Sequence, residues 1–209
     1  MNERYRTIKL YNLDKIGMLE PDFFQMPILK KDEIEFPDEL VGFNYLKTRK
    51  GTQEKAIHFF LDDYQFERIW KNPDAYLEKL YEYGAVLTPD FSLYLDMPES
   101  LKIYNTYRSR LIGQYMQSFG IKVIPTISWA DEKSFKYCFS GVAPGSTVAI
   151  STIGVMRTEK SKGIFREGAK KMMEIIKPEK VLVFGKKIDF EFGNCKYYNN
   201  EIIKKFEKK

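Results

Sequence analysis

The sequence predicts an α/β fold with a mainly parallel sheet built from repeated βα units. Five short apolar segments predict strands, and each interval between them contains a segment with helical spacing; the strands are 56–61, 85–88, 121–127, 147–153 and 181–184. Units of roughly 30 residues are typical of right-handed βαβ repeats. Because a full TIM barrel takes about 250 residues, the 209 residues predict an incomplete or distorted TIM-like barrel, with an open doubly wound sheet as the alternative.

The first part of the chain precedes these units. Residues 1–37 contain three prolines and no sustained periodicity, so we expect an extended segment that wraps a single domain spanning 1–209. A further strand is predicted at 40–46. The polar segment after it, 47–55, is too short for a helical crossover. This strand is therefore expected to pair antiparallel with the next one or to lie at the sheet edge.

Helix boundary signals follow in the middle of the chain. Asn72 and Pro73 begin a predicted helix that Gly84 ends, because asparagine is a good N-cap and proline suits the first helical turn. A longer helix is predicted at 98–119, where apolar residues recur at helical spacing.

The second half of the chain repeats the strand–helix pattern. Within 119–155, two apolar runs are joined by an amphipathic stretch at 131–139, which is typical of two parallel strands joined by a helix. A lysine-rich helix is predicted from about 159 to 176. Alternating apolar residues at 188–192 predict an edge strand or hairpin, and 201–209 predicts a basic terminal helix.

The composition is typical of a soluble globular protein, with 44% hydrophobic and 30% charged residues. No apolar run approaches the roughly 18 residues of a membrane span. The N-terminal sequence MNERYRTIKL is charged where a signal peptide is apolar. We therefore expect a cytoplasmic protein with no membrane partner.

Few residues are available for thiol or imidazole chemistry. Two cysteines, Cys138 and Cys195, are too few for a disulfide framework, and the single histidine, His58, excludes a site with two histidine ligands. His58 lies inside the apolar run at 56–61, so we expect a strand residue whose ring is hydrogen-bonded. A His–Cys catalytic pair is the alternative.

The net charge of +5 is distributed unevenly along the chain. Residues 1–100 carry 13 Lys and Arg against 19 Asp and Glu, a balance of −6, whereas residues 101–209 carry 21 against 10, a balance of +11. A basic half favours phosphate-bearing partners such as nucleotides or nucleic acid. Solvated, lysine-rich helix faces are the alternative explanation.

Polar side chains follow each of the five predicted strands. Because the carboxyl ends of parallel strands meet at one face of the fold, we expect these side chains to surround a common site. In chain order they are Asp62 and Asp63, then Asp90 and Ser92, then Ser128, Trp129 and Asp131, then Ser151 and Thr152, and last Gly185 and Lys186.

The aspartates of this set predict metal or acid–base chemistry. Asp62 and Asp63 are candidate ligands of a divalent cation such as Mg²⁺, which prefers oxygen ligands and needs no histidine. Asp90 and Asp131 are candidate catalytic residues, since a desolvated carboxyl group can act as a general acid or base. The alternative is structural, because Asp131 occupies a helix-capping position and Asp90 a Pro-Asp turn.

The remaining residues predict a binding site for a substrate. Ser151, Thr152 and Lys186 are candidate phosphate contacts, together with the backbone N–H groups near Gly154. Neither this segment nor 141–147 has the spacing of a Walker motif. Trp129 is a candidate to stack on a base or sugar ring, although such a residue is more often a rim residue that packs on its own helix.

Four sequence segments carry a resemblance to a known family. They are FFLDDYQFERIW at 59–70, YGAVLTPDFSLY at 83–94, IPTISWAD at 124–131 and STIGV at 151–155. Over about residues 35–185, the chain resembles the uncharacterised domain-of-unknown-function family forty-four seventeen of bacteria, phages and mobile elements. The family carries no established activity and no catalytic residues to transfer. The resemblance implies a phage or mobile-element accessory protein, with nucleic acid, nucleotides or a host protein as partners.

Three hypotheses of function follow, and the sequence leaves open whether the protein is an enzyme. The first is a protein that binds a phosphate-bearing ligand at the C-terminal mouth of the sheet, with or without hydrolysing it. The second is a non-catalytic interaction protein that inhibits or recruits a host factor. The third is a sugar hydrolase that uses two carboxylates, whose separation in the structure would distinguish it.

Overall fold

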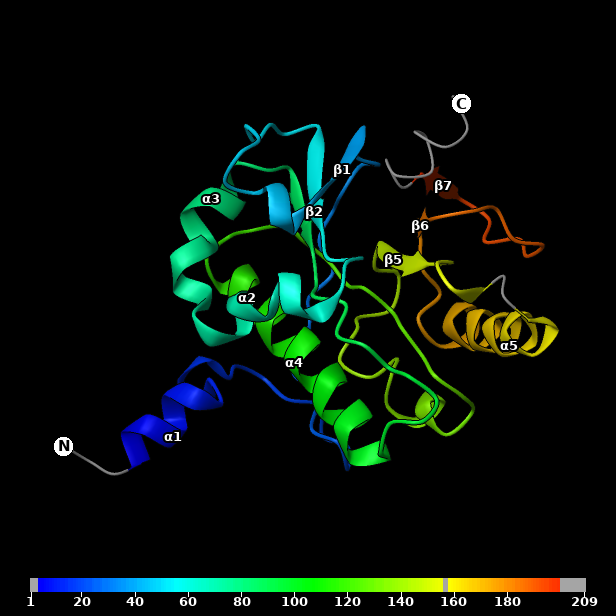
Figure 1. Ribbon diagram of the computed structural model, residues 1–209, viewed down its shortest axis with the longest axis horizontal. Helices are drawn as coiled ribbons and strands as arrows, with labels where there is room; N and C mark the ends of the chain where they lie inside the picture. Colours follow the sequence, from blue (N-terminus) through cyan, green and yellow to red (C-terminus); the bar gives the residue numbers. More distant parts are fainter. Residues whose placement is uncertain (1–3, 156–157, 200–209) are drawn as a thin grey trace.

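A computed structural model describes residues 4–155 and 158–199 of the protein. The strands of this described part are parallel and form two sheets (Figure 1). The first sheet contains β1 (Glu39–Gly42), β2 (Lys55–His58), β3 (Ala85–Leu87) and β4 (Val123–Ile124), in that order, and the second contains β5 (Val148–Ser151), β6 (Val181–Phe184) and β7 (Cys195–Tyr198). The predicted α/β fold with a mainly parallel sheet is confirmed.

A short backbone contact joins the two sheets. Thr126 and Ala149 form an isolated parallel bridge. The N–H of Ile127 donates to the carbonyl of Ala149 at 2.8 Å, and the N–H of Ala149 donates to the carbonyl of Pro125 at 2.9 Å. The strands therefore follow one another in chain order across both sheets. Between β7 and β1 no strand pairing is found in the described residues, so the sheet does not close into a barrel.

An apolar core lies on the inner side of both sheets, and every strand contributes to it. Because successive side chains of a strand point to opposite faces, only alternate residues take part. The strand members of this inner core are Leu40, Ala56, Ala85, Leu87, Ile124, Ala149, Leu182, Phe184 and Tyr198. The residues between them face outward to the helices, so both faces of β2 to β6 are buried, as is typical of parallel sheets, whereas the edge strand β7 is only partly covered.

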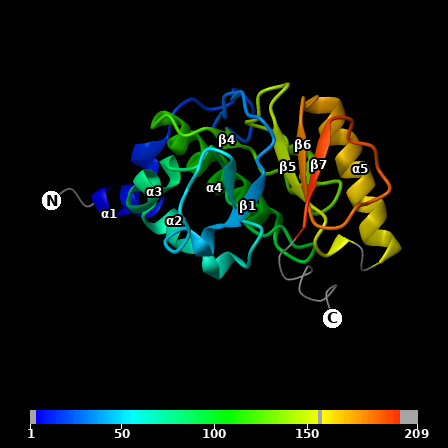
Figure 2. The ribbon, with the colours of Figure 1, turned by 90° about the horizontal axis from the view of Figure 1, so that it is seen from above.

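The helices lie outside the two sheets, and all except α1, which has no buried residue, pack on their outer faces. They are α1 (Arg4–Leu10), α2 (Glu67–Lys71), α3 (Leu77–Tyr81), α4 (Glu99–Ser118) and α5 (Glu159–Ile175), with 3₁₀ turns η1 (Leu13–Lys15), η2 (Phe43–Tyr45), η3 (Asp63–Gln65), η4 (Pro73–Tyr76) and η5 (Ser134–Lys136). Helices α2, α3 and α4 share a core with β1–β4, whereas α5 lies along the outside of β5, β6 and β7 (Figure 2). None of the helices in the described ranges has the length and apolar character needed to cross a bilayer.

Helix α5 shows how the sequence builds one of these layers. Phe165, Ala169 and Met172 recur at helical spacing and are buried against the second sheet. The helix begins at a side-chain cap, because the Thr158 hydroxyl accepts a hydrogen bond from the N–H of Ser161 at 3.0 Å. The predicted helix at 159–176 is confirmed.

Two connections differ from what we expected. Of the two alternatives for the first strand, the position at the sheet edge is confirmed, but β1 pairs parallel rather than antiparallel with β2, and the turn η2 with its following loop makes the crossover that we expected to need a helix. The stretch 131–139 forms only the turn η5 rather than a helix. The Ser134 hydroxyl there accepts hydrogen bonds from the N–H groups of Ala130 and Asp131, and such local side-chain bonds compete with helix formation.

The last strand also differs from the expectation. Residues 188–192 alternate in polarity but form no strand, with a bend at Asp189, and Ile188 and Phe192 pack into the core beside α5. The strand of this region is β7, which pairs parallel with β6. The predicted terminal helix at 201–209 lies outside the described residues.

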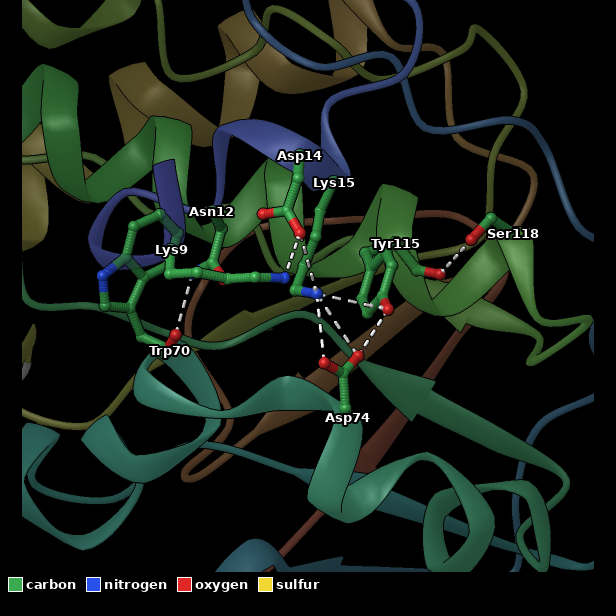
Figure 3. A network of polar contacts seen from close by, with 8 residues as sticks. All are labelled: Lys9, Asn12, Asp14, Lys15, Trp70, Asp74, Tyr115 and Ser118. Carbon is green, nitrogen blue, oxygen red and sulfur yellow. Dashed lines mark hydrogen bonds and ion pairs between the residues drawn. The ribbon is translucent and has the colours of Figure 1, made fainter. Parts of the chain in front are cut away.

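The N-terminal segment, expected to be extended, contains α1 and η1 and is attached to the body by a polar network (Figure 3). The Lys15 ammonium lies 3.1 Å from Asp74 Oδ2 and 4.5 Å from the centre of the Tyr115 ring, and the Tyr115 hydroxyl donates to Asp74. Asn12, in a left-handed conformation with φ 52°, donates to the carbonyl of Trp70 at 2.8 Å. These contacts tie η1 to α2, η4 and α4.

Candidate functional site

A cleft of about 1100 Å³ opens at the C-terminal ends of the strands. Segments that follow five different strands contribute to its wall, together with the first turns of α5. Its lining includes Asn44 and Tyr45 after β1, Phe60 and Asp62 after β2, Asp90 and Ser92 after β3, Ser128 and Trp129 after β4, Gly154 after β5, and Ser161 and Phe165 of α5. Among the predicted site residues, Asp62, Asp90, Trp129 and Ser151 line this cleft, so the parallel strands do bring them together.

Asp90 is the carboxylate most altered by its surroundings. It follows β3, and its Oδ1 accepts a hydrogen bond from the hydroxyl of Ser128. Burial raises the pKa of Asp90 from its ordinary 3.8 to about 6, opposed by the Ser128 hydrogen bond and assisted by the charge of Asp63. Its side chain is partly open to the cleft. A carboxyl group that titrates close to neutral pH can donate or accept a proton in catalysis.

Asp62 and Asp63 diverge, although they are adjacent in sequence. Asp62 is exposed in the cleft wall. The Asp63 carboxylate instead accepts hydrogen bonds from Ser92, at 2.8 Å from its hydroxyl and 3.2 Å from its N–H. Across residues 4–155 and 158–199, no group of three or more Asp, Glu, His or Cys side chains could hold a metal ion. The protein alone therefore does not assemble the predicted carboxylate cage for a cation in this part of the chain.

Asp131 caps the turn η5. Its Oδ1 accepts hydrogen bonds from the N–H groups of Lys133 at 3.1 Å and Ser134 at 3.3 Å. Its other oxygen lies 4.0 Å from the ammonium of Lys102, which is 2% exposed. The cleft is lined by the preceding Ala130 rather than by Asp131. The structure thus gives Asp131 the capping geometry that its sequence position also indicated.

The three predicted phosphate contacts occupy different places. Ser151 lines the cleft, and its hydroxyl accepts the N–H of Ile153 at 3.2 Å. Thr152 is buried and donates to the carbonyl of Lys186 at 2.8 Å, which ties the end of β5 to the end of β6. The exposed Lys186 does not line the cleft. Beside Ser151, Gly154 has φ 81° and open space around its α-carbon, so its backbone is accessible.

Trp129 has two neighbours of different kinds. One face of the residue lines the cleft, while its ring packs on Phe165 of α5 with 5.2 Å between ring centres. A Cβ atom at Gly168 would lie 2.2 Å from the indole Nε1, so the ring fits against α5 only because that position is glycine. The tryptophan is thereby held in place at the rim.

Arg110 supports the loop that carries Trp129. This arginine of α4 is 1% exposed and donates to three backbone carbonyls, those of Thr126 at 3.0 Å, Cys138 at 2.7 Å and Ser140 at 3.1 Å. Burial lowers the pKa of Arg110 to about 10. Because the bonds span both ends of the loop after β4, they fix the position of the segment between them.

His58 lies in the cleft and was not among the predicted site residues. It ends β2, where its Nδ1 accepts the N–H of Phe60 at 3.1 Å, and its ring lies 4.6 Å from that of Phe184. Burial lowers the pKa of His58 to about 3, so the ring is neutral. Neither cysteine lines the cleft, and burial raises the pKa of the Cys138 thiol. His58 lies at a strand end, four residues before Asp62, and this position is the signal that could have identified it as a site residue.

Comparisons with known proteins place the chain beside phage proteins. The sequence profile described as "Domain of unknown function (DUF4417)" matches residues 20–206. The chain is 40% identical over 164 residues to the Gene 1 protein of Mycobacterium phage L5, covering 78% of this chain and 71% of that protein. It is 41% identical over 152 residues to the Gene 1 protein of Mycobacterium phage D29, covering 72% of this chain and 56% of that protein. No solved structure matches it significantly.

Proposed function

The chain belongs to the DUF4417 family of domains of unknown function, and we propose that it binds and hydrolyses a nucleotide or another phosphate-bearing ligand in the cleft at the C-terminal ends of its strands. The observation that carries the proposal is the cleft itself. It combines the raised-pKa carboxyl of Asp90 with aromatic walls and an open backbone turn at Gly154. The similarity to phage proteins supports an accessory role in a phage or mobile element.

The phosphate end of the ligand belongs at the β5–α5 side. Ser151 and Gly154 line the cleft there, and Ser161 belongs to the first turn of the 17-residue helix α5. The N-terminus of a helix of this length favours an anion, since its first N–H groups and its dipole both point toward it. The acidic lining residues, Asp62, Asp90 and Asp96, follow β2 and β3 in the same cleft, so a phosphate can approach them only when a cation offsets its charge.

A ring system fits the rest of the cleft. Phe60, Trp129 and Phe184 contribute aromatic surface to its wall. Aromatic side chains bind bases and sugars by stacking, with little dependence on which base is present. A volume of about 1100 Å³ is large enough for a nucleotide, since small-molecule sites typically measure 300–1,000 Å³.

Asp90 supplies the chemistry of the proposed hydrolysis. With a pKa of about 6, raised by burial, its carboxyl is largely ionised at neutral pH and accepts the proton of an attacking water. The water oxygen forms a new bond to phosphorus, and the bond to the leaving oxygen breaks. A Mg²⁺ ion held by the phosphate oxygens of the ligand and by the exposed carboxylate of Asp62 would offset the repulsion, since Mg²⁺ commonly takes one or two carboxylates together with substrate phosphates.

Calorimetry with nucleoside mono-, di- and triphosphates and a short single-stranded DNA, with and without Mg²⁺, tests the proposal. We expect wild-type protein to bind at least one of them. Asp90→Asn should retain binding but lose hydrolysis by 100-fold or more, within the range typical of general bases. Asp189→Asn, which alters a side chain that is 99% exposed outside the cleft, is the matched control and should behave as wild type. Absence of binding under all conditions contradicts the proposal.

A second function, recruitment or inhibition of a host protein, is favoured by the N-terminal surface. Helix α1 has no buried residue, and large apolar side chains along 10–23 are exposed, among them Leu10 at 65%, Met18 at 62% and Phe23 at 92%. Exposed apolar groups of this kind are typical of protein–protein contacts. Stoichiometric capture of one host protein that is lost on Phe23→Ser, without any metal dependence, would support this alternative over ligand hydrolysis.

A further inference from the structure

The ring of His58 has one occupied and one available nitrogen. The N–H of Phe60 donates to Nδ1 at 3.1 Å, so Nδ1 carries no proton and the neutral ring bears its hydrogen on Nε2. Within the described residues, no oxygen or nitrogen accepts a hydrogen bond from this Nε2–H. The residue is only 6% exposed, and yet it lines the cleft. Nε2 is not a fully buried atom, because the only such side-chain atom without a partner in the described residues is Arg108 Nε. The Nε2–H is therefore accessible from the cleft, where a ligand atom can accept its hydrogen bond.

The position of the ring directs Nε2 to the cleft. A Cβ atom built at Gly42 would lie 3.6 Å from Nε2 and 2.5 Å from Asn44 Oδ1, so the nitrogen lies at the end of β1 near Asn44, and all three residues line the cleft. The ring itself is held by Phe60 and Phe184, whose ring centres lie 5.7 Å and 4.6 Å from it. The donor therefore has a fixed direction before any ligand arrives.

The surroundings of Nε2 select the kind of group that can bind there. Phe60 and Phe184 stack on each other, with 4.9 Å between ring centres, and their small exposed parts, 7% and 4%, make an apolar wall beside the histidine. A charged phosphate would be desolvated against this wall, at a cost that one neutral hydrogen bond does not offset. A flat, uncharged ring with an oxygen or unprotonated nitrogen acceptor meets both conditions, because it packs against this apolar wall and accepts the hydrogen bond.

We infer that His58 is the base-recognising residue of the cleft, and that its Nε2–H donates to a carbonyl oxygen or unprotonated ring nitrogen of a nucleobase. The inference rests on the proposed function and deepens it. It gives the ligand a direction, with the base at the β1–β2–β6 side and the phosphate at the β5–α5 side. His58 acts in binding and takes no proton from the substrate.

Nitrogen NMR on the wild-type protein tests the inference directly, because His58 is the only histidine and gives one pair of ring resonances in tag-free, ¹⁵N-histidine-labelled protein. We expect the Nε2–H tautomer before ligand is added. Nucleoside monophosphates should shift the Nε2 resonance, whereas ribose 5-phosphate, which lacks a base, should not. The Nδ1–H tautomer, or an Nε2 resonance unmoved by a nucleotide that binds, would overturn the inference.

Calorimetry on variants separates this inference from the function on which it rests. His58→Phe keeps an aromatic ring but removes the donor, and should weaken nucleoside monophosphate binding about tenfold or more while leaving ribose 5-phosphate affinity unchanged. His58→Gln, which can donate a hydrogen bond from its amide group, should lose less affinity for nucleoside monophosphates than His58→Phe. If wild type binds nucleotides and His58→Phe binds them equally well, the inference fails and the proposed function stands. If wild type binds neither the nucleotides nor ribose 5-phosphate, the proposed function fails with it.

Discussion

The hydroxyl of Ser128 donates a hydrogen bond to the carboxylate of Asp90 from the end of the adjacent strand, 38 residues further along the chain. The pair exists because β3 and β4 are neighbours and run in the same direction, so the segments that follow them emerge side by side. Ser128 stabilises the charged form of Asp90, while burial favours the neutral form and has the larger effect on its pKa.

This balance predicts how Asp90 affects stability at different pH values. Because burial raises the pKa of Asp90 from 3.8 to about 6, the folded protein holds more protons than the unfolded chain between these values. The contribution of Asp90 to stability is therefore present below about pH 4 and is lost as the pH rises through 6. Asp90→Asn should remove this loss. Between pH 4.5 and 7.5 the free energy of unfolding of the variant, measured in urea, should therefore fall less, or rise more, than that of wild type, while the opposite contribution of His58 is the same in both proteins.

Ser128→Ala provides the opposite change at the same site. It removes the hydrogen bond that favours the ionised carboxyl, so the pKa of Asp90 should rise further above its ordinary value. The pH-dependent loss of stability should then extend to higher pH in the same urea experiments. Equal pH profiles for Ser128→Ala and Asp90→Asn would contradict this account of the pair.

Arg110 should be required for stability because three backbone carbonyls depend on it. Arg110→Met leaves these acceptors without their donor, and an unsatisfied buried group costs about 1–3 kcal/mol. We expect the free energy of unfolding to fall by at least about 3 kcal/mol, with a smaller loss for Arg110→Lys. The exposed Lys170→Met on α5 is the control and should stay within about 0.5 kcal/mol of wild type.

Two glycines of α5 should respond to alanine with opposite signs. A Cβ at Gly163 meets nothing within 4 Å, so Gly163→Ala should stabilise the helix by roughly 0.5–1 kcal/mol. A Cβ at Gly168 would lie 2.2 Å from Trp129 Nε1. The clash should outweigh the same helical gain, giving a net loss of about 1–2 kcal/mol and a change in tryptophan fluorescence. Stabilisation by both substitutions would contradict the observed packing of Trp129.

The polar network of Figure 3 should loosen in acid. The hydrogen bond from Tyr115, together with the ammonium of Lys15, lowers the pKa of Asp74 against the opposing effect of burial. Its contribution is therefore present above the ordinary value of 3.8 and is lost as the pH falls through the lower folded value. Tyr115→Phe should bring that loss to a higher pH, measured as hydrogen exchange of residues 12–18. Tyr64→Phe, which changes an 81% exposed side chain, should leave this exchange unchanged.

The strand elements show how far a local pattern reaches. The apolar run at 181–184 became β6 with the same bounds, because four buried β-branched or large apolar residues suit a strand covered on both faces. The alternating run at 188–192 did not become a strand, although its pattern was as regular. Its apolar side chains are buried against the α5 layer without pairing, and β7 formed at Cys195–Tyr198 because β6 offered a free edge there.

The candidate site shows where local reasoning ends. The convergence of Asp62, Asp90, Trp129 and Ser151 on one cleft followed from parallel strands. The roles of Asp63 and Thr152 could not be predicted in this way, because each forms a hydrogen bond with a group from another strand–helix unit. Asp63 accepts from Ser92, and Thr152 donates to the carbonyl of Lys186.

By itself, the sequence determined that this protein is an α/β chain of parallel strands with polar residues at their carboxyl ends. Apolar runs and glycine or proline boundaries are local, and they act wherever they occur in a chain. Only the tertiary structure decided which polar side chains face the cleft and brought His58 to the cleft wall. It also decided that, in the described residues, β7 and β1 do not pair, so that the sheet does not close. The physical reason is that a shift of one position along a strand turns the side chain to the opposite face of the sheet. In addition, the group that forms a hydrogen bond with this side chain comes from a distant part of the chain.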